Sequence, residues 1–198
     1  MYPFPITKLI KAFSRLPGVG TRTAERFVFH LLRSGKKETG ELILALRDLT
    51  ERIKSCTTCW DFSDVSPCAI CQNKKRDPAI LCVVALPHDI QVIESTGSFS
   101  GRYHVLRGLL SEDSEANPAF KIKELLGRIK EGSFKEILLA LNPNLAGEQT
   151  MMYLEQSIAK VNPSLTVTRL ARGLPLGSDI AYADEITLKS AIAHRTKK

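Results

Sequence analysis

The sequence predicts a chain of several modules, part α+β and part α/β in class. Three observations predict this organisation. Apolar residues recur at helical spacing in the first 54 residues, four cysteines form two close pairs, and short apolar runs alternate with helical stretches thereafter. We expect a helical N-terminal module at 1–54, a small cysteine module at 55–76, an α/β domain with a mainly parallel sheet at 77–172, and a helical C-terminal tail at 173–198.

The charge balance favours a polyanionic partner. The 198 residues include 28 Lys and Arg against 21 Asp and Glu, a net charge of +7, and a basic surface attracts nucleic acid. No apolar run approaches the roughly 20 residues that a membrane span requires, and the first residues lack the layout of a secretory signal. We therefore expect no membrane association and a cytoplasmic location at the nucleoid.

Three helices are predicted in the N-terminal module. Apolar spacing predicts helices over residues 6–16, 21–33 and 38–54, with Thr21 as the cap of the second and Gly35 at its end. We expect the third helix to turn one apolar stripe inward, made of Leu42, Ala45, Leu46, Leu49 and Ile53.

The connection between the first two helices is a candidate DNA-binding hairpin. It reads Leu-Pro-Gly-Val-Gly over residues 16–20, and its glycines leave backbone amides free to approach a phosphate. Arg22 and Arg26, one turn apart, are expected to hold phosphates, with Lys8 and Lys11 along the DNA path. The hairpin resembles a helix-hairpin-helix, which binds DNA without reading bases and depends on salt. The alternative is a plain turn between helices that serves dimer packing.

Four of the five cysteines have the spacing of a zinc site. Cys56, Cys59, Cys68 and Cys71 form two Cys-x2-Cys pairs that can close one tetrahedral Zn²⁺ centre per chain. Four protein ligands leave no open position, so the zinc should be structural, and catalytic or redox roles are disfavoured.

Strand and helix signals alternate in the second half. Apolar runs predict strands over residues 80–86, 136–141 and 165–170, and helices are predicted over 121–130 and 148–160. An acidic polar loop is expected at 111–117. The segment after the first strand carries one acid, Glu94, near the end of its helix.

Together, the hairpin, the cysteine module, the stretch at 97–106 and the C-terminal stretch at 169–185 resemble the RecR family along nearly the whole chain. The resemblance implies a Toprim domain, in which a glutamate and an Asp-x-Asp pair hold Mg²⁺. Glu94 matches the glutamate, but Asn142 and Asn144 stand where the aspartates are expected, and amides are poor Mg²⁺ ligands beside carboxylates. We therefore expect no catalysis, with Glu94 and Glu148 serving partner contacts.

The resemblance also implies a role in recombinational DNA repair. The resemblance implies that protomers assemble through their termini into a tetrameric ring, which encircles duplex or gapped DNA. With RecO, and in some settings RecF, the ring helps to load RecA on single-stranded gaps. The tail includes a Walker B-like segment at 180–185, but the chain has no phosphate-binding loop, so we read it as an assembly surface. The alternatives are an active Mg²⁺-dependent Toprim phosphoryl-transfer enzyme and an adaptor that contacts only proteins.

Overall fold

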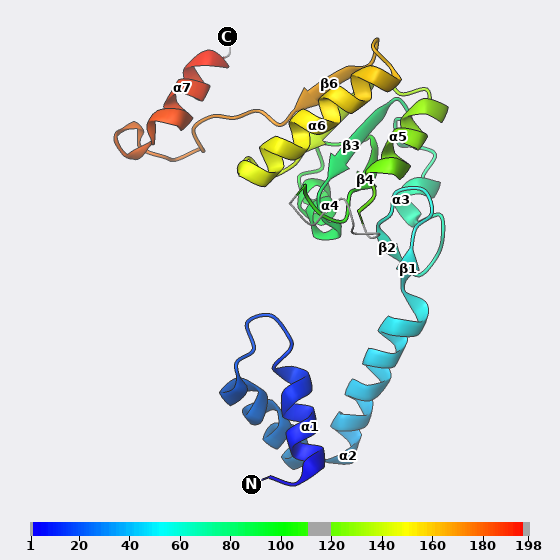
Figure 1. Ribbon diagram of the computed structural model, residues 1–198, viewed down its shortest axis with the longest axis vertical. Coiled ribbons are helices and arrows are strands. Elements are labelled where there is room, and N and C mark those ends of the chain that lie inside the picture. The colour runs from blue at the N-terminus through cyan, green and yellow to red at the C-terminus, as the bar shows by residue number, and fades with distance from the viewer. Residues whose placement is uncertain (1, 111–119, 196–198) are drawn as a thin grey trace. The chain divides into compact units, whose positions relative to one another are not determined.

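The computed structural model describes residues 2–110 and 120–195. It separates into two compact units, Met1–Ile53 and Lys54–Lys198 (Figure 1). The acidic loop predicted at 111–117 lies outside the described residues. The predicted fold class is confirmed: a helical N-terminal part precedes a cysteine cluster, an α/β part with a parallel sheet, and a helical tail.

The N-terminal unit consists of two helices, α1 (Phe4–Phe13) and α2 (Thr21–Arg52). They pack through a small core of Ile10, Ala24 and Val28. The second and third predicted helices form one element with a kink at Gly35, whose φ of 86° and ψ of 178° are non-helical. A positive φ is easy for glycine because it lacks a Cβ atom. The predicted break at this residue is therefore confirmed, although the helix resumes after it.

Two expectations for α2 are wrong. The N-cap is Gly20 rather than Thr21, and no side chain caps the start of the helix. The stripe expected to face inward is exposed, with Leu46 at 54% and Leu49 at 58% of their full accessibility. Helical periodicity shows that a stripe exists, but it does not show whether the same chain covers it.

The cysteine module is a small irregular unit on the sheet domain. Strand β1 (Lys54–Ser55) pairs antiparallel with β2 (Phe62–Ser63), and the short helix α3 (Ala69–Gln72) follows. The backbone N–H of Val105 donates a hydrogen bond to the carbonyl oxygen of Cys59 at 2.8 Å. The module is therefore attached to the main sheet by backbone as well as by side chains.

The main sheet has four parallel strands in the order β4-β3-β5-β6 (Figure 1). The three predicted strands are confirmed as β3, β5 and β6, and β4 was not predicted as a strand. The strands are β3 (Ile80–Val84), β4 (Arg102–Val105), β5 (Glu136–Ala140) and β6 (Thr166–Arg169), connected in part by α4 (Pro87–Ser95), α5 (Ile122–Glu131) and α6 (Leu145–Val161).

Residues along each strand alternate between two cores, as the pleat requires. Leu81, Val83 and Ile137 pack with residues of α5 and α6 on one face. Cys82 and Val84 pack on the other face, with residues of α4 and β4 and with part of the cysteine module. Because both faces are covered, the strands read as continuous apolar runs rather than as an alternation.

The C-terminal tail is helical but largely uncovered. It contains the 3₁₀ helix η2 (Ile180–Tyr182) and helix α7 (Glu185–Ala193), neither of which has a buried residue. Asp184 caps α7, because its Oδ1 accepts a hydrogen bond from the backbone N–H of Thr187 at 2.9 Å. Within residues 2–110 and 120–195, no helix combines the length and apolar content that crossing a bilayer demands.

Candidate metal centre and nucleic-acid interface

The four predicted cysteines come together at one point. Their Sγ atoms all lie within 4.8 Å of one another, and all four thiols are free. The Sγ atoms of Cys59 and Cys68 are 3.5 Å apart, and those of Cys56 and Cys71 are 4.0 Å apart. A tetrahedral zinc with bonds of about 2.3 Å to sulfur requires sulfur atoms about 3.8 Å apart. The arrangement therefore fits a four-thiolate metal centre.

The backbone around the cluster favours negatively charged sulfur. The N–H of Cys68 donates to the Sγ of Cys56 at 3.3 Å. Burial raises the pKa of Cys56, but backbone N–H groups of Cys59, Cys68 and Thr58 outweigh burial and lower the pKa to about 6. Such N–H···S contacts stabilise a thiolate, which is the form that binds a metal.

At Cys59, in contrast to Cys56, the neighbouring thiols raise the pKa. A hydrogen bond with the thiol of Cys71 and burial both raise the pKa of Cys59. A bound divalent cation would remove this conflict, because it attracts all four sulfur atoms at once.

An arginine from the sheet domain holds the cysteine module in place. The Nε of Arg107 donates to the carbonyl oxygen of Trp60 at 2.6 Å, and its Nη2 donates to the Oγ of Ser55 at 3.1 Å. The guanidinium also lies 3.7 Å from the centre of the Phe62 ring. The module is too small to form a core of its own, so these contacts and the cysteine cluster define its shape.

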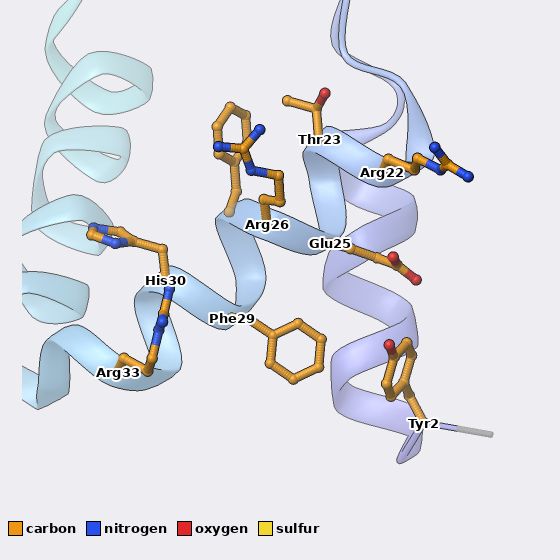
Figure 2. Close-up of a pocket in the computed structure, with 9 residues that line it drawn as sticks. Tyr2, Arg22, Thr23, Glu25, Arg26, Phe29, His30 and Arg33 are labelled. Atoms are coloured by element: carbon orange, nitrogen blue, oxygen red, sulfur yellow. The ribbon is translucent and has the colours of Figure 1, made fainter.

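Arg22 and Arg26 line one groove of the N-terminal unit. The groove has a volume of about 970 Å³, and it is also lined by Arg33, by His30 and by one acid, Glu25. Figure 2 shows the two arginine side chains leaving the first turns of α2 in diverging directions. Neither forms a hydrogen bond or ion pair with a described residue. The groove therefore presents unpaired positive charge next to the uncapped start of α2.

Aromatic rings form the other part of this groove. Tyr2 and Phe29 meet edge to face, with ring centroids 5.3 Å apart (Figure 2). Lys8 and Lys11 are exposed on α1, but the described residues that line the groove do not include them. The structure thus brings the two predicted arginines together and places the two lysines outside their groove.

Glu94 is held inside the sheet domain by two partners. One carboxylate oxygen accepts a hydrogen bond from the Tyr103 hydroxyl at 2.6 Å, and the other forms an ion pair with the Nη2 of Arg76. Burial raises the pKa of Glu94, but these partners outweigh burial and hold it below its ordinary value. The Nη1 of Arg76 donates to the carbonyl oxygen of Gly101 at 2.9 Å. The three side chains join the end of the cysteine module to α4 and β4.

Glu148 lies in a separate network at the start of α6. It forms ion pairs with Arg169 and Arg172, and Arg169 is also bidentate to Glu155 at 2.6 and 2.7 Å. No described residue belongs to the networks of both Glu148 and Glu94.

One of the two asparagines that stand at the positions expected for aspartates has a structural task. Asn144 caps α6, because its Oδ1 accepts a hydrogen bond from the N–H of Gly147 at 2.8 Å. Gly147 is buried against the carbonyl oxygen of Asn142. In the part of the chain that the structure describes, the four cysteines are the only cluster of three or more His, Cys, Asp or Glu side chains suited to a metal.

Sequence reasoning missed Arg76, Tyr103 and Arg128 as members of buried networks. Tyr103 and the adjacent His104 are fully buried, although their segment is polar in sequence. Their partners lie 9 to 25 residues away in the chain, so the local sequence does not identify these contacts. A run of aromatic and basic residues between two glycines was the one available indication.

Comparisons with known proteins agree with this architecture. The family model described as RecR, helix-hairpin-helix matches residues 6–50, the Toprim domain model matches 79–171, and the model described as RecR, C-terminal matches 173–196. The cysteine module lies between the first two matches.

Relatives match over almost their whole length. Recombination protein RecR of Paenarthrobacter aurescens (strain TC1) is 41% identical over 98% of this chain and 98% of its own. The protein of the same name from Gloeobacter violaceus (strain ATCC 29082 / PCC 7421) is 45% identical with the same coverage. That of Staphylococcus saprophyticus is 41% identical over 99% of this chain and 98% of its own. With these matches and three successive domain models, the chain belongs to the RecR family.

Proposed function

We propose that this chain is a DNA-binding scaffold of recombinational repair. The observation that carries the proposal is the groove at the N-terminal hairpin, where Arg22 and Arg26 have no described acidic partner and α2 starts without a side-chain cap. Unpaired guanidinium groups and free backbone amides at a helix start both favour phosphate oxygens. Lys8 and Lys11 extend the positive charge along α1. Binding through phosphates is tolerant of sequence and suits duplex and gapped DNA.

We further propose one structural Zn²⁺ per chain, bound by Cys56, Cys59, Cys68 and Cys71. The four sulfur atoms and their backbone N–H donors fit this ion. When bound, zinc supplies cross-linking energy to a module that lacks a core of its own. We also propose that the chain is divided into four modules, at 1–54, 55–76, 77–172 and 173–198.

The scaffold works without phosphoryl-transfer chemistry. Both carboxylate oxygens of Glu94 already have partners, Arg76 and Tyr103, and Glu148 is paired with two arginines. Asn142 and Asn144 supply neutral oxygens, which bind Mg²⁺ weakly. Glu94 and Glu148 then contribute to partner contact indirectly, because their ion pairs fix the surface residues around them.

Membership of the RecR family supports a proposal for the partners. The relatives are named recombination protein RecR, so their name refers to recombination. We propose that this chain self-associates into a tetrameric ring around DNA at the nucleoid in the cytoplasm, and that with RecO, and in some settings RecF, it promotes loading of RecA on gapped DNA. Exposed apolar residues in α2 and in the tail support self-association.

The salt dependence of DNA affinity tests the proposal. Replacing Arg22 and Arg26 by Ala should reduce the slope of log affinity against log salt by about 0.9 for each lost phosphate contact. The matched control replaces Arg47 and Arg52 by Ala. These residues lie on the same helix but are already paired with Glu51 and Asp48, so the slope should stay close to wild type.

The three alternatives, a scaffold, an enzyme and an adaptor, are separated by incubating the protein with gapped and closed circular DNA and Mg²⁺ and then analysing the DNA on a gel. Intact DNA together with direct binding supports the scaffold. Strand cleavage or synthesis that disappears in Glu94→Gln would establish an enzyme instead. Absence of binding by the wild type would leave the adaptor, and equal slopes in the two double variants would remove Arg22 and Arg26 from the interface.

A further inference from the structure

The groove at the start of α2 contains aromatic rings as well as cations, and the phosphate contacts proposed above use only the cations. Its permanent cations are Arg22, Arg26 and Arg33, and its one acid is Glu25. With His30 neutral, three arginines and one glutamate leave two positive charges in the groove. Because positive charge exceeds negative charge, the groove favours an anionic ligand.

Three aromatic rings line the same groove without belonging to the buried core of the N-terminal unit. Tyr2, Phe27 and Phe29 are 46%, 42% and 36% exposed, and the core between α1 and α2 includes none of them. Phe27 packs edge to face on Phe13, with ring centroids 5.7 Å apart. Burial of an aromatic ring is strongly favourable. Rings that the fold leaves open beside a basic surface therefore indicate a ligand that covers them.

The contact between Tyr2 and Phe29 leaves flat ring faces open. The two ring planes meet at 65° (Figure 2), so one ring offers its edge to the face of the other. Such a contact covers one ring face, whereas parallel stacking would cover two. Since both rings are also partly exposed, a further planar group can stack on them.

Cations and an aromatic ring alternate along one face of α2. Three arginines and one ring lie on it at intervals of four, three and four residues: Arg22, Arg26, Phe29 and Arg33. Successive members are about 6, 4.5 and 6 Å apart along the axis, at 1.5 Å per residue. The arginines are exposed, and none of them has a hydrogen bond or ion pair with a described residue. An extended anion on this face therefore meets positive charge on both sides of the ring.

This combination distinguishes a single strand of DNA from a duplex. In a duplex the bases are stacked on one another, and a protein outside it meets phosphates and the edges of the bases. In a single strand the base faces are accessible and stack on aromatic side chains, while a positively charged groove follows the backbone. Only the single strand can use both the cations and the open rings.

We propose that this groove binds a single-stranded stretch of DNA, whose bases stack on Tyr2 and Phe29 and whose phosphates contact the three arginines. This assignment rests on the proposed binding of DNA and adds the form of DNA that the groove selects. In a gapped molecule, the groove holds the unpaired strand. Duplex DNA binds the same arginines without the stacking contacts.

A DNA strand without bases separates stacking from charge. The full-length chain is titrated with three labelled DNAs of equal length: a single strand of mixed sequence, an abasic single strand and a duplex. We expect the wild type to bind the intact strand about 10 to 100 times more tightly than the abasic strand. In the double variant Tyr2→Leu with Phe29→Leu, the two strands should bind alike. Its affinity for the duplex, and the salt dependence of that affinity, should stay at the wild-type level because the phosphate contacts remain.

A conservative variant and a matched control test whether the ring in the groove is responsible. Tyr2→Phe keeps the ring and should keep the wild-type preference for the intact strand. Phe4→Leu removes a ring from α1 that is 78% exposed and lies outside the described lining of the groove. This control should also keep the preference, and an equal loss in it would overturn the proposal. Sedimentation of each variant shows whether self-association has changed.

The stacking contacts and the proposed function can fail separately. A wild type that binds none of the three DNAs would refute DNA binding itself. Binding that depends on Arg22 and Arg26 but is equal for the intact and abasic strands would refute the stacking alone. Smaller assemblies of the double variant, with the same loss for all three DNAs, would assign the rings to a contact between copies and would also overturn it. Should the double variant fail to fold, Tyr2→Leu is compared with Tyr2→Phe, and the proposal stands only if the preference falls in the first and not in the second.

Discussion

At the scale of single residues, the sheet domain depends on partly buried charged groups that are paired with one another. Arg76 is 12% exposed and Glu94 is 27% exposed at the side chain, so their ion pair is only partly screened by solvent. Tyr103 adds a hydrogen bond to the same carboxylate. Breaking one member of such a set leaves the others buried without a partner. Glu94 is therefore important for folding.

Glu94→Gln should reduce the free energy of unfolding at neutral pH by about 1–3 kcal/mol. Because the pKa of Glu94 is lowered in the folded protein, its contribution is present above the unfolded pKa of about 4.3 and is lost as the pH falls through the folded value. The difference between wild type and variant in urea unfolding should thus be constant near neutral pH and shrink in acid. A difference that is absent at neutral pH, or that grows in acid, would contradict this prediction.

At the scale of elements, the sequence predicts most helices and strands but not the tertiary contacts between them. The break at Gly35 and three of the four strands follow from glycine and from apolar runs. Strand β4 does not, because Arg102, Tyr103 and His104 are polar in sequence. Both Tyr103 and His104 are buried, and each forms a hydrogen bond there: Tyr103 with Glu94, and His104 with the carbonyl oxygen of Lys121. The four cysteines are predictable from spacing, whereas Arg76 and Arg128 join networks that only the tertiary fold creates.

The start of α6 contains a close backbone contact that mutation can test. A Cβ atom on Gly147 would fall well inside van der Waals distance of the backbone carbonyl oxygen of Asn142, whereas Gly127 in α5 has open space around it. Gly147→Ala should therefore destabilise the protein by about 1–3 kcal/mol. Gly127→Ala should stabilise it by about 0.5–1 kcal/mol, because alanine favours the helix. Urea unfolding of both variants checks the prediction, and equal effects would show that the start of α6 can shift.

At the scale of the whole molecule, apolar surface lies uncovered near both ends of the chain. In the N-terminal unit it is the stripe on the second half of α2, and in the tail it lies on η2 and α7, where Tyr182 is 89% and Ile186 is 82% exposed. Soluble monomers rarely leave contiguous apolar surface open. Neither surface contributes to the cores of its own unit, so both are available to a second copy of the chain.

Replacing Tyr182 and Ile186 by Ser should therefore weaken self-association without unfolding the chain. A fully buried side chain of this size contributes about 1.5–3 kcal/mol, so loss of both should raise the dissociation constant of the assembly about a hundredfold or more. Sedimentation over a range of concentrations measures this change, and Lys189→Ser, an exposed polar position on the same helix, is the control. If the double variant sediments like the wild type, the tail is not the assembly surface. If the control dissociates equally, the effect is not specific to the two apolar side chains, and the prediction fails. Retention of circular dichroism at 222 nm in both variants, together with the loss of assembly, would show that the tail acts between chains, because η2 and α7 have no residue buried within one chain.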